Sequence, residues 1–392
     1  MARQLAYALI TPYSLRKSRT GGIIGRIMTL SDLDWAGVRM YAPSDEFMHA
    51  YVATVQAQDS EPDVKRLLVD YVNNCLRPKN RFGIPNRTMV LFLAGDDAVR
   101  KLRRDVIGSM GSEPVGDTVR GTFGDCVSRA DGTVEYFEPA VITAPDDATN
   151  RKQLALFARY ADSDGGILEH VMKFPEGVEP ETALVILKPE NFSKRTARPG
   201  NIIDLFSKTG LYIVGAKLLR LSVAQGVEFY GPLLEVFPEK LKPVVANGLA
   251  EALKETFEFS VDAETVNRMA EHLKDFNARW EFNRIVQYMT GVNPAALRPG
   301  EENRPGTEKC LALLYQGENA VAKIRDRLGP TDPSKAPAGT VRSEVGRDLM
   351  VNAAHASDSV ENAMRERRII GMIEDKDPEI KHVIEEYLSN DQ

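Results

Sequence analysis

The chain has 392 residues, of which 43% are hydrophobic and 27% are charged, which is ordinary for a globular protein with enough material for two domains. Its formal net charge of −6 gives no reason to expect a nucleic-acid or anionic-membrane partner. Three widely spaced cysteines argue against a disulfide framework or a zinc site and fit a reducing compartment. Neither a signal-peptide core nor a bilayer-spanning apolar stretch is present, so we expect a cytoplasmic protein.

The first half alternates short apolar runs with helical segments. Strands are predicted at residues 5–10, 35–40 and 88–94. One helix is predicted to begin within residues 21–27 and another at residue 96, and helical segments are predicted at 44–72 and 150–160. A turn is predicted at residues 116–121. Residues 161–180 are rich in Asp, Gly, Glu and Pro and are interpreted as a linker that packs locally, which makes them the domain boundary.

The second half repeats the first in the same order. Residues 183–189, 199–203, 213–218, 318–325 and 339–342 correspond to residues 5–12, 21–24, 35–40, 96–103 and 117–120. We therefore interpret the chain as two copies of one αβ domain, at 1–160 and 181–392, joined by the linker at 161–180. Because strands are few and the connections contain whole helices, we expect α+β sandwiches, with helices on one face of a mainly antiparallel sheet.

Residues 352–359 contain His355, one of only five histidines, between small residues that leave room for a bulky group. Asp358 and Ser359 precede a helical run that starts at Val360, a pattern typical of a helix N-cap, whose N–H groups favour anions. A nucleophilic imidazole beside an anion site suits phosphoryl transfer through a phosphohistidine. Alone, a histidine is more often structural or simply exposed than catalytic.

Several motifs of the second half together resemble the nucleoside diphosphate kinase family. They are Lys188-Pro189-Glu190, Gly215-Ala216-Lys217, Glu228-Phe229-Tyr230 and residues 317–321, 329–333, 339–342 and 352–359. The likeness covers most of residues 181–372, and Asn-x-x-His-x-Ser-Asp is the family's signature, although Ala356 replaces the glycine after the histidine. The resemblance implies a ferredoxin-like βαββαβ core. It also implies transfer of the γ-phosphate of ATP to a nucleoside diphosphate, with Mg²⁺ carried on the phosphates.

The resemblance assigns catalytic roles to five residues of this sequence. His355 would be the nucleophile, Glu366 would orient its ring, and the Ser357 hydroxyl would back that carboxylate. Lys188 and Asn352 match residues that contact the ribose hydroxyls and the reacting phosphate. A lysine that ends an apolar strand is hard to explain otherwise, whereas Glu366 alone could be a surface helix residue.

The resemblance also implies a nucleotide-binding set. Arg325, Thr331 and Arg342 match the family's phosphate clamp, together with Lys188 and Asn352, and Tyr230 matches the aromatic beside the histidine. Arginine forks suit phosphate oxygens, and fixed positive donors stabilise the charge that develops during phosphoryl transfer. Arg325 alone would be read as a solvated helix charge and Tyr230 as a packing residue, so the joint occurrence carries the interpretation.

Two inserts depart from the family pattern. Residues 231–278 form a long insert with helical periodicity at 244–253 and 265–276, and residues 292–308 are predicted to form a loop. After the first insert, Glu281 falls on the position that stacks on the base, with Trp280 and Phe282 as neighbours able to replace it. The inserts could cover the nucleotide cleft or form an oligomer surface.

The first copy lacks the catalytic residues. Its positions equivalent to His355, Asn352, Glu366 and Lys188 hold Ile142, Pro139, Gln153 and Thr11. An isoleucine cannot carry a phosphoryl group. Arg103 and Arg120 survive from the clamp, so weak phosphate binding remains open, although a role in structure or assembly is the preferred interpretation.

The sequence therefore predicts a two-domain nucleoside diphosphate kinase that turns over by a ping-pong mechanism through phospho-His355. Its partners would be nucleoside di- and triphosphates, with no nucleic acid and no membrane, and it would form a homo-oligomer. Two alternatives stay open. One is a protein-directed phosphotransferase that uses phospho-His355, and the other is a nucleotide-binding regulator or scaffold without turnover.

Overall fold

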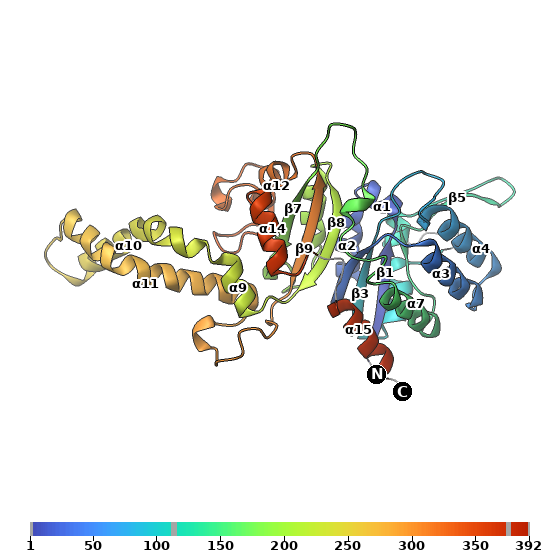
Figure 1. Ribbon diagram of the computed structural model, residues 1–392, viewed down its shortest axis with the longest axis horizontal. Coiled ribbons are helices and arrows are strands. Elements are labelled where there is room, and N and C mark those ends of the chain that lie inside the picture. The colour runs from blue at the N-terminus through green and yellow to red at the C-terminus, as the bar shows by residue number, and fades with distance from the viewer. Residues whose placement is uncertain (1–2, 111–115, 374–377, 391–392) are drawn as a thin grey trace. The chain divides into compact units, whose positions relative to one another are not determined.

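The computed structural model describes residues 3–110, 116–373 and 378–390. Within them are two four-stranded sheets (Figure 1), ordered β2-β3-β1-β6 and β10-β7-β9-β8. The pairs β1–β3, β1–β6, β2–β3, β7–β9 and β7–β10 are antiparallel. The strands are β1 (Arg3–Ile10), β2 (Asp34–Tyr41), β3 (Thr88–Asp96), β6 (Val141–Ile142), β7 (Glu181–Leu187), β8 (Tyr212–Leu219), β9 (Cys310–Gly317) and β10 (Ala354–Ala356). Numbered within its own half, each sheet has the strand order 2-3-1-4 of a βαββαβ sandwich, so the predicted ferredoxin-like fold class is confirmed.

The predicted strands of the first half are present as β1, β2 and β3. The two fourth strands, β6 and β10, have no counterpart among the predictions. They contain two and three residues, too few for an alternating pattern to be visible in the sequence. β4 (Asp125–Ser128) and β5 (Val134–Glu138) form a separate hairpin.

The helices of the two halves fall mostly where the pattern placed them. In the first half they are α1 (Pro12–Arg16), α2 (Thr20–Leu30), α3 (Asp45–Ala57), α4 (Pro62–Tyr71), α5 (Ala98–Arg100), α6 (Val119–Phe123) and α7 (Asp147–Arg159), with π-helical turns at Val72–Leu76 and Lys101–Ile107. In the second half they include α8 (Arg198–Ser207), α12 (Ala320–Leu328), α13 (Val341–Val345), α14 (Val360–Ile369) and α15 (Pro378–Ser389). The single segment expected at 44–72 is divided, and α4 restarts with Pro62 in its first turn, where a missing N–H is tolerated.

Both faces of the first sheet are covered by helices, rather than one face as expected. On β1, Ala6, Ala8 and Ile10 belong to one core with the apolar residues of α2. The alternate residues of β1 belong to a second core with residues of α3, α7 and α15. A strand that is apolar at nearly every position exposes apolar surface to water unless both of its faces are buried.

The two halves meet through equivalent elements. Helix α2 packs on its counterpart α8, and edge strand β2 lies beside its counterpart β8. The segment after α7 joins the two edges, because the Gly166 N–H donates to the Met40 carbonyl and the Leu168 N–H donates to the Val214 carbonyl. Contact between like elements is the pattern of a two-fold interface, here formed within one chain. One core cluster contains residues of both halves.

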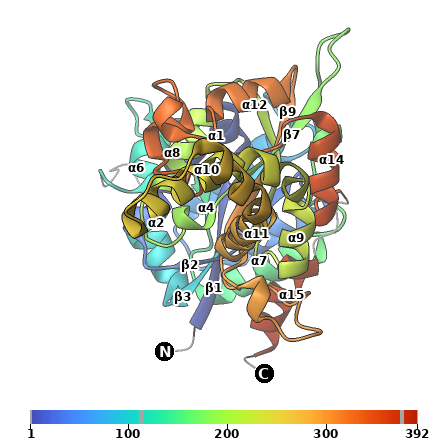
Figure 2. The same cartoon turned by 90° about the vertical axis from the view of Figure 1, so that its left-hand side faces the viewer.

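Residues Arg220–Cys310 form a second compact unit. It holds α9 (Val223–Tyr230) and a hairpin of two long helices, α10 (Leu233–Thr256) and α11 (Ala263–Thr290), which contain the two helical segments predicted for the insert (Figures 1 and 2). Ala246 on α10 packs with Val266 and Ala270 on α11. A short 3₁₀ turn (Pro294–Ala296) interrupts the loop that follows.

The contact between α2 and α8 leaves no room for a side chain at Gly200. A Cβ there would lie 2.2 Å from the Gly21 carbonyl oxygen and 2.6 Å from the Gly25 nitrogen, and these backbone atoms cannot turn aside. We expect Gly200→Ala to lower the free energy of unfolding by about 1–3 kcal/mol, as overpacking does. Thermal denaturation measures it, with Gly248→Ala on α10 as control, because nothing lies within 4 Å of that position. Equal melting temperatures for Gly200→Ala and wild type would contradict the close packing.

Candidate active site

His355 lies at the centre of β10, the edge strand beside β7. It is paired with Ile186, while Ala354 and Ala356 pair with Leu187 and Val185. Both alanines are buried, whereas the His355 side chain is 22% exposed. Because side chains alternate across a strand, the imidazole lies on the face opposite the two alanines. The pairing therefore fixes the backbone of His355 and leaves its ring accessible.

A buried carboxylate holds the ring. Nε2 of His355 is 2.9 Å from Oε2 of Glu366 on α14, and the Ser357 hydroxyl donates to the same oxygen at 2.5 Å. The Glu366 side chain is only 7% exposed. A carboxylate oxygen accepts hydrogen bonds, so Nε2 carries the ring proton and Nδ1 carries the lone pair of the neutral imidazole. The arrangement brings together three residues that the resemblance had grouped.

Helix α14 is itself fixed at both ends. Its N-cap is Ser359, as predicted, whose hydroxyl accepts from the Asn362 N–H at 3.0 Å. Next to Glu366, the buried Arg367 donates to both carboxylate oxygens of Glu169, at 3.0 and 3.2 Å, and to the Met372 carbonyl. A bidentate pair of this kind restrains orientation as well as position. Neither Arg367 nor Glu169 was singled out in the sequence, and no motif marks the pair, because the two residues lie far apart along the chain.

The turn that leads into β10 is conformationally strained. Ala353 has φ of 75°, in the left-handed region that costs about 1–3 kcal/mol for a residue other than glycine. Its N–H donates to the Glu190 carboxylate at 2.8 Å, and its carbonyl accepts from the Lys188 N–H and the Asn191 side chain. Glu190 belongs to a motif already noted, but its supporting role becomes visible only in three dimensions.

Lys188 and Asn352 meet beside this turn. The Lys188 ammonium donates to the Asn352 side-chain oxygen at 2.6 Å and to the Met350 carbonyl at 3.0 Å. The Asn352 amide donates in turn to the carbonyls of Thr331, at 3.1 Å, and Leu349, at 2.8 Å. The lysine at the end of β7 is thus held against the loop that carries Asn352, and Thr331 is brought to the same place.

Two arginines add positive charge near β10. Arg342 on α13 donates to the Gly329 carbonyl at 2.9 Å and to the Ala354 carbonyl at 3.1 Å, next to the histidine. Burial, and then the neighbouring charge of Arg325 on α12, lower the pKa of Arg342 to about 10. Arg325 itself is exposed. A cationic cluster of this kind can bind an anion with several oxygens.

The equivalent site in the first half keeps the frame but not the nucleophile. Ile142 on β6 pairs with Leu9, as His355 pairs with Ile186, and Ala140 has φ of 59° where Ala353 has 75°. Ile142 is fully buried in the second core. Gln153 is also buried, and its side-chain oxygen accepts from the Tyr7 hydroxyl at 2.7 Å.

The aromatic candidates lie in the second unit. Tyr230 is a buried residue of α9. Its place beside the histidine stays a prediction. On α11, Phe282 is 3% exposed, whereas Trp280 is exposed, with the Arg284 guanidinium over its ring at 4.6 Å. Glu281 forms an ion pair with the same arginine. Of the two aromatics considered for base stacking, only Trp280 presents its ring at the surface.

Two further observations concern metals and membranes. In the part of the chain that the structure describes, no three His, Cys, Asp or Glu side chains gather as ligands for a metal ion. None of the described helices combines the length and apolar character needed to span a membrane.

Comparison with known proteins identifies the family. The family described as nucleoside diphosphate kinase matches residues 260–372. The nucleoside diphosphate kinase of a Nitratiruptor species is 30% identical over 186 residues, which span 47% of this chain and 91% of that enzyme. The chain belongs to the nucleoside diphosphate kinase family. The nucleoside diphosphate kinase of Bdellovibrio bacteriovorus is 32% identical over 186 residues, or 47% of this chain and 89% of the relative.

Among solved structures, a nucleoside diphosphate kinase from Pyrobaculum aerophilum is 27% identical, with a TM-score of 0.34, and the match covers 49% of this chain and 95% of that one. The residues that match the family lie in the second half and include His355, Glu366 and Arg342.

The hydrogen bond to Glu366 predicts one tautomer for His355. In ¹⁵N-labelled protein with a neutral ring, we expect nitrogen shifts of a protonated Nε2 and an unprotonated Nδ1. Glu366→Ala should shift the ring toward the mixture found in free imidazoles, because the acceptor is gone. Glu361→Ala, at an exposed position of the same helix, serves as control. An Nδ1-protonated ring in the wild type would contradict the geometry.

Proposed function

We propose that this protein is a nucleoside diphosphate kinase that transfers the γ-phosphate of ATP to nucleoside diphosphates through phospho-His355. The observation that carries the proposal is the hydrogen bond between His355 and the buried Glu366, which Ser357 supports. The ring lies on a strand flanked by Lys188 with Asn352 and by Arg342. Family membership supports the same reaction class.

The transfer would proceed in two matching steps. The lone pair on Nδ1 of His355 attacks the γ-phosphorus, the bond from phosphorus to the bridging oxygen breaks, and ADP leaves with that electron pair. A second diphosphate then attacks the phosphohistidine, and the Nδ1–P bond breaks in return. Glu366 accepts the Nε2–H bond throughout and stabilises the positive charge that forms on the ring.

The cationic residues would position the phosphates. Arg325, Thr331 and Arg342 would form the phosphate clamp. Lys188 and Asn352 would contact the ribose hydroxyls and the reacting phosphate, and Tyr230 would lie beside the histidine. Positioning and electrostatic stabilisation supply most of the catalysis in phosphoryl transfer. Mg²⁺ would arrive on the nucleotide phosphates, where it neutralises charge.

The first half would be a degenerate domain of the same family, at 1–160, joined by the 161–180 segment to the catalytic domain at 181–392. Buried Ile142 and Gln153, in the places of His355 and Glu366, support this assignment. The proposal includes a cytoplasmic location, which the free cysteines Cys75, Cys126 and Cys310 favour, and assembly into a homo-oligomer.

Replacing the nucleophile tests the activity. With ATP and dTDP in a coupled assay, we expect His355→Ala to abolish turnover, because it removes the imidazole that accepts the phosphoryl group. Label from γ-labelled ATP should be acid-labile and base-stable, and should appear on the wild type only. Equal rates for the two proteins would remove the enzyme hypothesis. Labelling without transfer to dTDP would point instead to a protein acceptor, and binding without labelling to a nucleotide-binding regulator.

Replacing the orienting carboxylate tests the mechanism. We expect Glu366→Gln to lower kcat by about 10²-fold, the cost of misplacing a reacting group, with little change in KM. Glu361→Gln on the exposed face of α14 should keep the wild-type rate. If Glu366→Gln retained full kcat, the carboxylate would have no part in holding the ring.

A further inference from the structure

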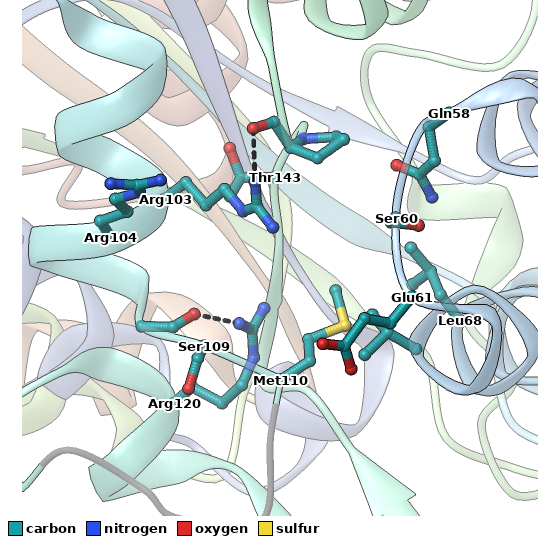
Figure 3. A pocket seen from close by; sticks show the side chains of 13 residues that line it. Gln58, Ser60, Glu61, Leu68, Arg103, Arg104, Ser109, Met110, Arg120 and Thr143 are labelled. Atoms are coloured by element: carbon teal, nitrogen blue, oxygen red, sulfur yellow. Dashed lines mark hydrogen bonds between the residues drawn. The ribbon is translucent and has the colours of Figure 1, made fainter.

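The first half contains a cavity of about 620 Å³, and none of the proposed catalytic residues lines it. Arg103, Arg104 and Arg120 line one side of it, and residues of the α3–α4 connection line the other (Figure 3). Its volume is within the range of about 300–1,000 Å³ that small-molecule sites occupy. We call it the Arg103 cavity.

Two arginines of the Arg103 cavity, Arg103 and Arg120, donate to backbone carbonyl oxygens. Arg120 donates to the Gly108 carbonyl, and Arg103 donates to the Pro145 carbonyl at 2.7 Å (Figure 3). Arg120 also donates to the Val141 carbonyl at 2.8 Å. Across the described residues, no carboxylate forms an ion pair with either guanidinium. Burial, and then the charge of Arg103, lower the pKa of Arg120 to about 10. A partly buried cation beside a second cation is stabilised by an anion placed between them, because the anion supplies the missing opposite charge.

The opposite wall suits an uncharged organic group. Val64, Leu68 and Met110 supply apolar surface, and Gln58 and Ser60 supply polar groups. The Ser60 hydroxyl oxygen is buried and has no hydrogen-bond partner in the described part of the chain. Buried polar groups are nearly always hydrogen-bonded, so a ligand hydroxyl or ring nitrogen would complete this one. The lining also includes one acidic residue, Glu61, whose side chain extends from this wall into the cavity beside Met110 (Figure 3).

The second half contains an arginine in the position equivalent to Arg120. Arg120 and Arg342 make matching bonds, to the carbonyls of Gly108 and Gly329 and to those of Val141 and Ala354. The first half thus keeps the cationic end of the site, while its nucleophile position holds buried Ile142.

We propose that the Arg103 cavity binds a nucleoside phosphate and holds it without phosphoryl transfer. The phosphate lies between Arg103, Arg104 and Arg120, and the nucleoside lies against the apolar wall with its polar groups toward Gln58 and Ser60. The inference concerns the first half alone and does not depend on the activity proposed for His355.

Calorimetric titration of ADP into the full chain tests it. In His355→Ala protein, which removes turnover, we expect two binding sites per chain. Adding Arg103→Ala and Arg104→Ala should weaken one of them at least tenfold and leave the other unchanged. Arg129→Ala, at an exposed position of the β4–β5 hairpin, should leave both sites intact. One site that is insensitive to the double substitution would overturn the inference. One site that the double substitution abolishes would uphold it while telling against nucleotide binding at His355.

One further variant and two further ligands test the same site. Ser60→Trp places bulk in the cavity without touching the arginines, so it should remove the same site even if the arginine variant unfolds. Melting curves identify unfolding. Pyrophosphate and adenosine replace ADP in parallel titrations, and each should bind this site at least tenfold more weakly than ADP. Pyrophosphate binding as tight as that of ADP would overturn the nucleoside assignment.

Discussion

The carboxylate of Glu366 joins two elements that meet only in the folded chain. It accepts hydrogen bonds from His355 and Ser357, which lie on and just after β10, while it is itself carried by α14. A carboxylate this deeply buried is unfavourable without partners, so each of the three groups constrains the others. The pairing of β10 with β7 and the Arg367–Glu169 ion pair set the distance between strand and helix. The reactivity proposed for the ring depends on that distance.

The two halves keep the same frame and differ in the chemistry that it carries. In both halves, an arginine donates to the carbonyl of the glycine that ends the preceding helix and to a carbonyl of the last strand of the sheet. Those bonds serve the fold as well as a bound anion, so the arginines persist where the nucleophile does not. Ile142 and Gln153 have instead become part of a buried layer with Tyr7. The positions of the nucleophile and its carboxylate therefore contribute to the core of the first half.

The halves also share a core, because equivalent elements contact each other. Helices α2 and α8 approach so closely that Gly21, Gly25 and Gly200 face one another without side chains. The segment after α7 bridges the two edge strands and supplies Glu169, the partner of Arg367. A residue between the halves thus helps to place the helix that carries Glu366. This contact couples the geometry of the site to the packing of both halves.

Sequence alone determined the fold class, the internal repeat, the family and the set of candidate residues around His355. Those features are written in local patterns, such as apolar runs, glycine turns and a motif of seven residues, which need no knowledge of distant contacts. Short strands such as β10, the helices on both faces of the first sheet, and the supports from Glu169 and Glu190 were decided only by tertiary structure. Each depends on groups far apart in the chain, whose hydrogen bonds and burial exist only once the sheets have formed and packed.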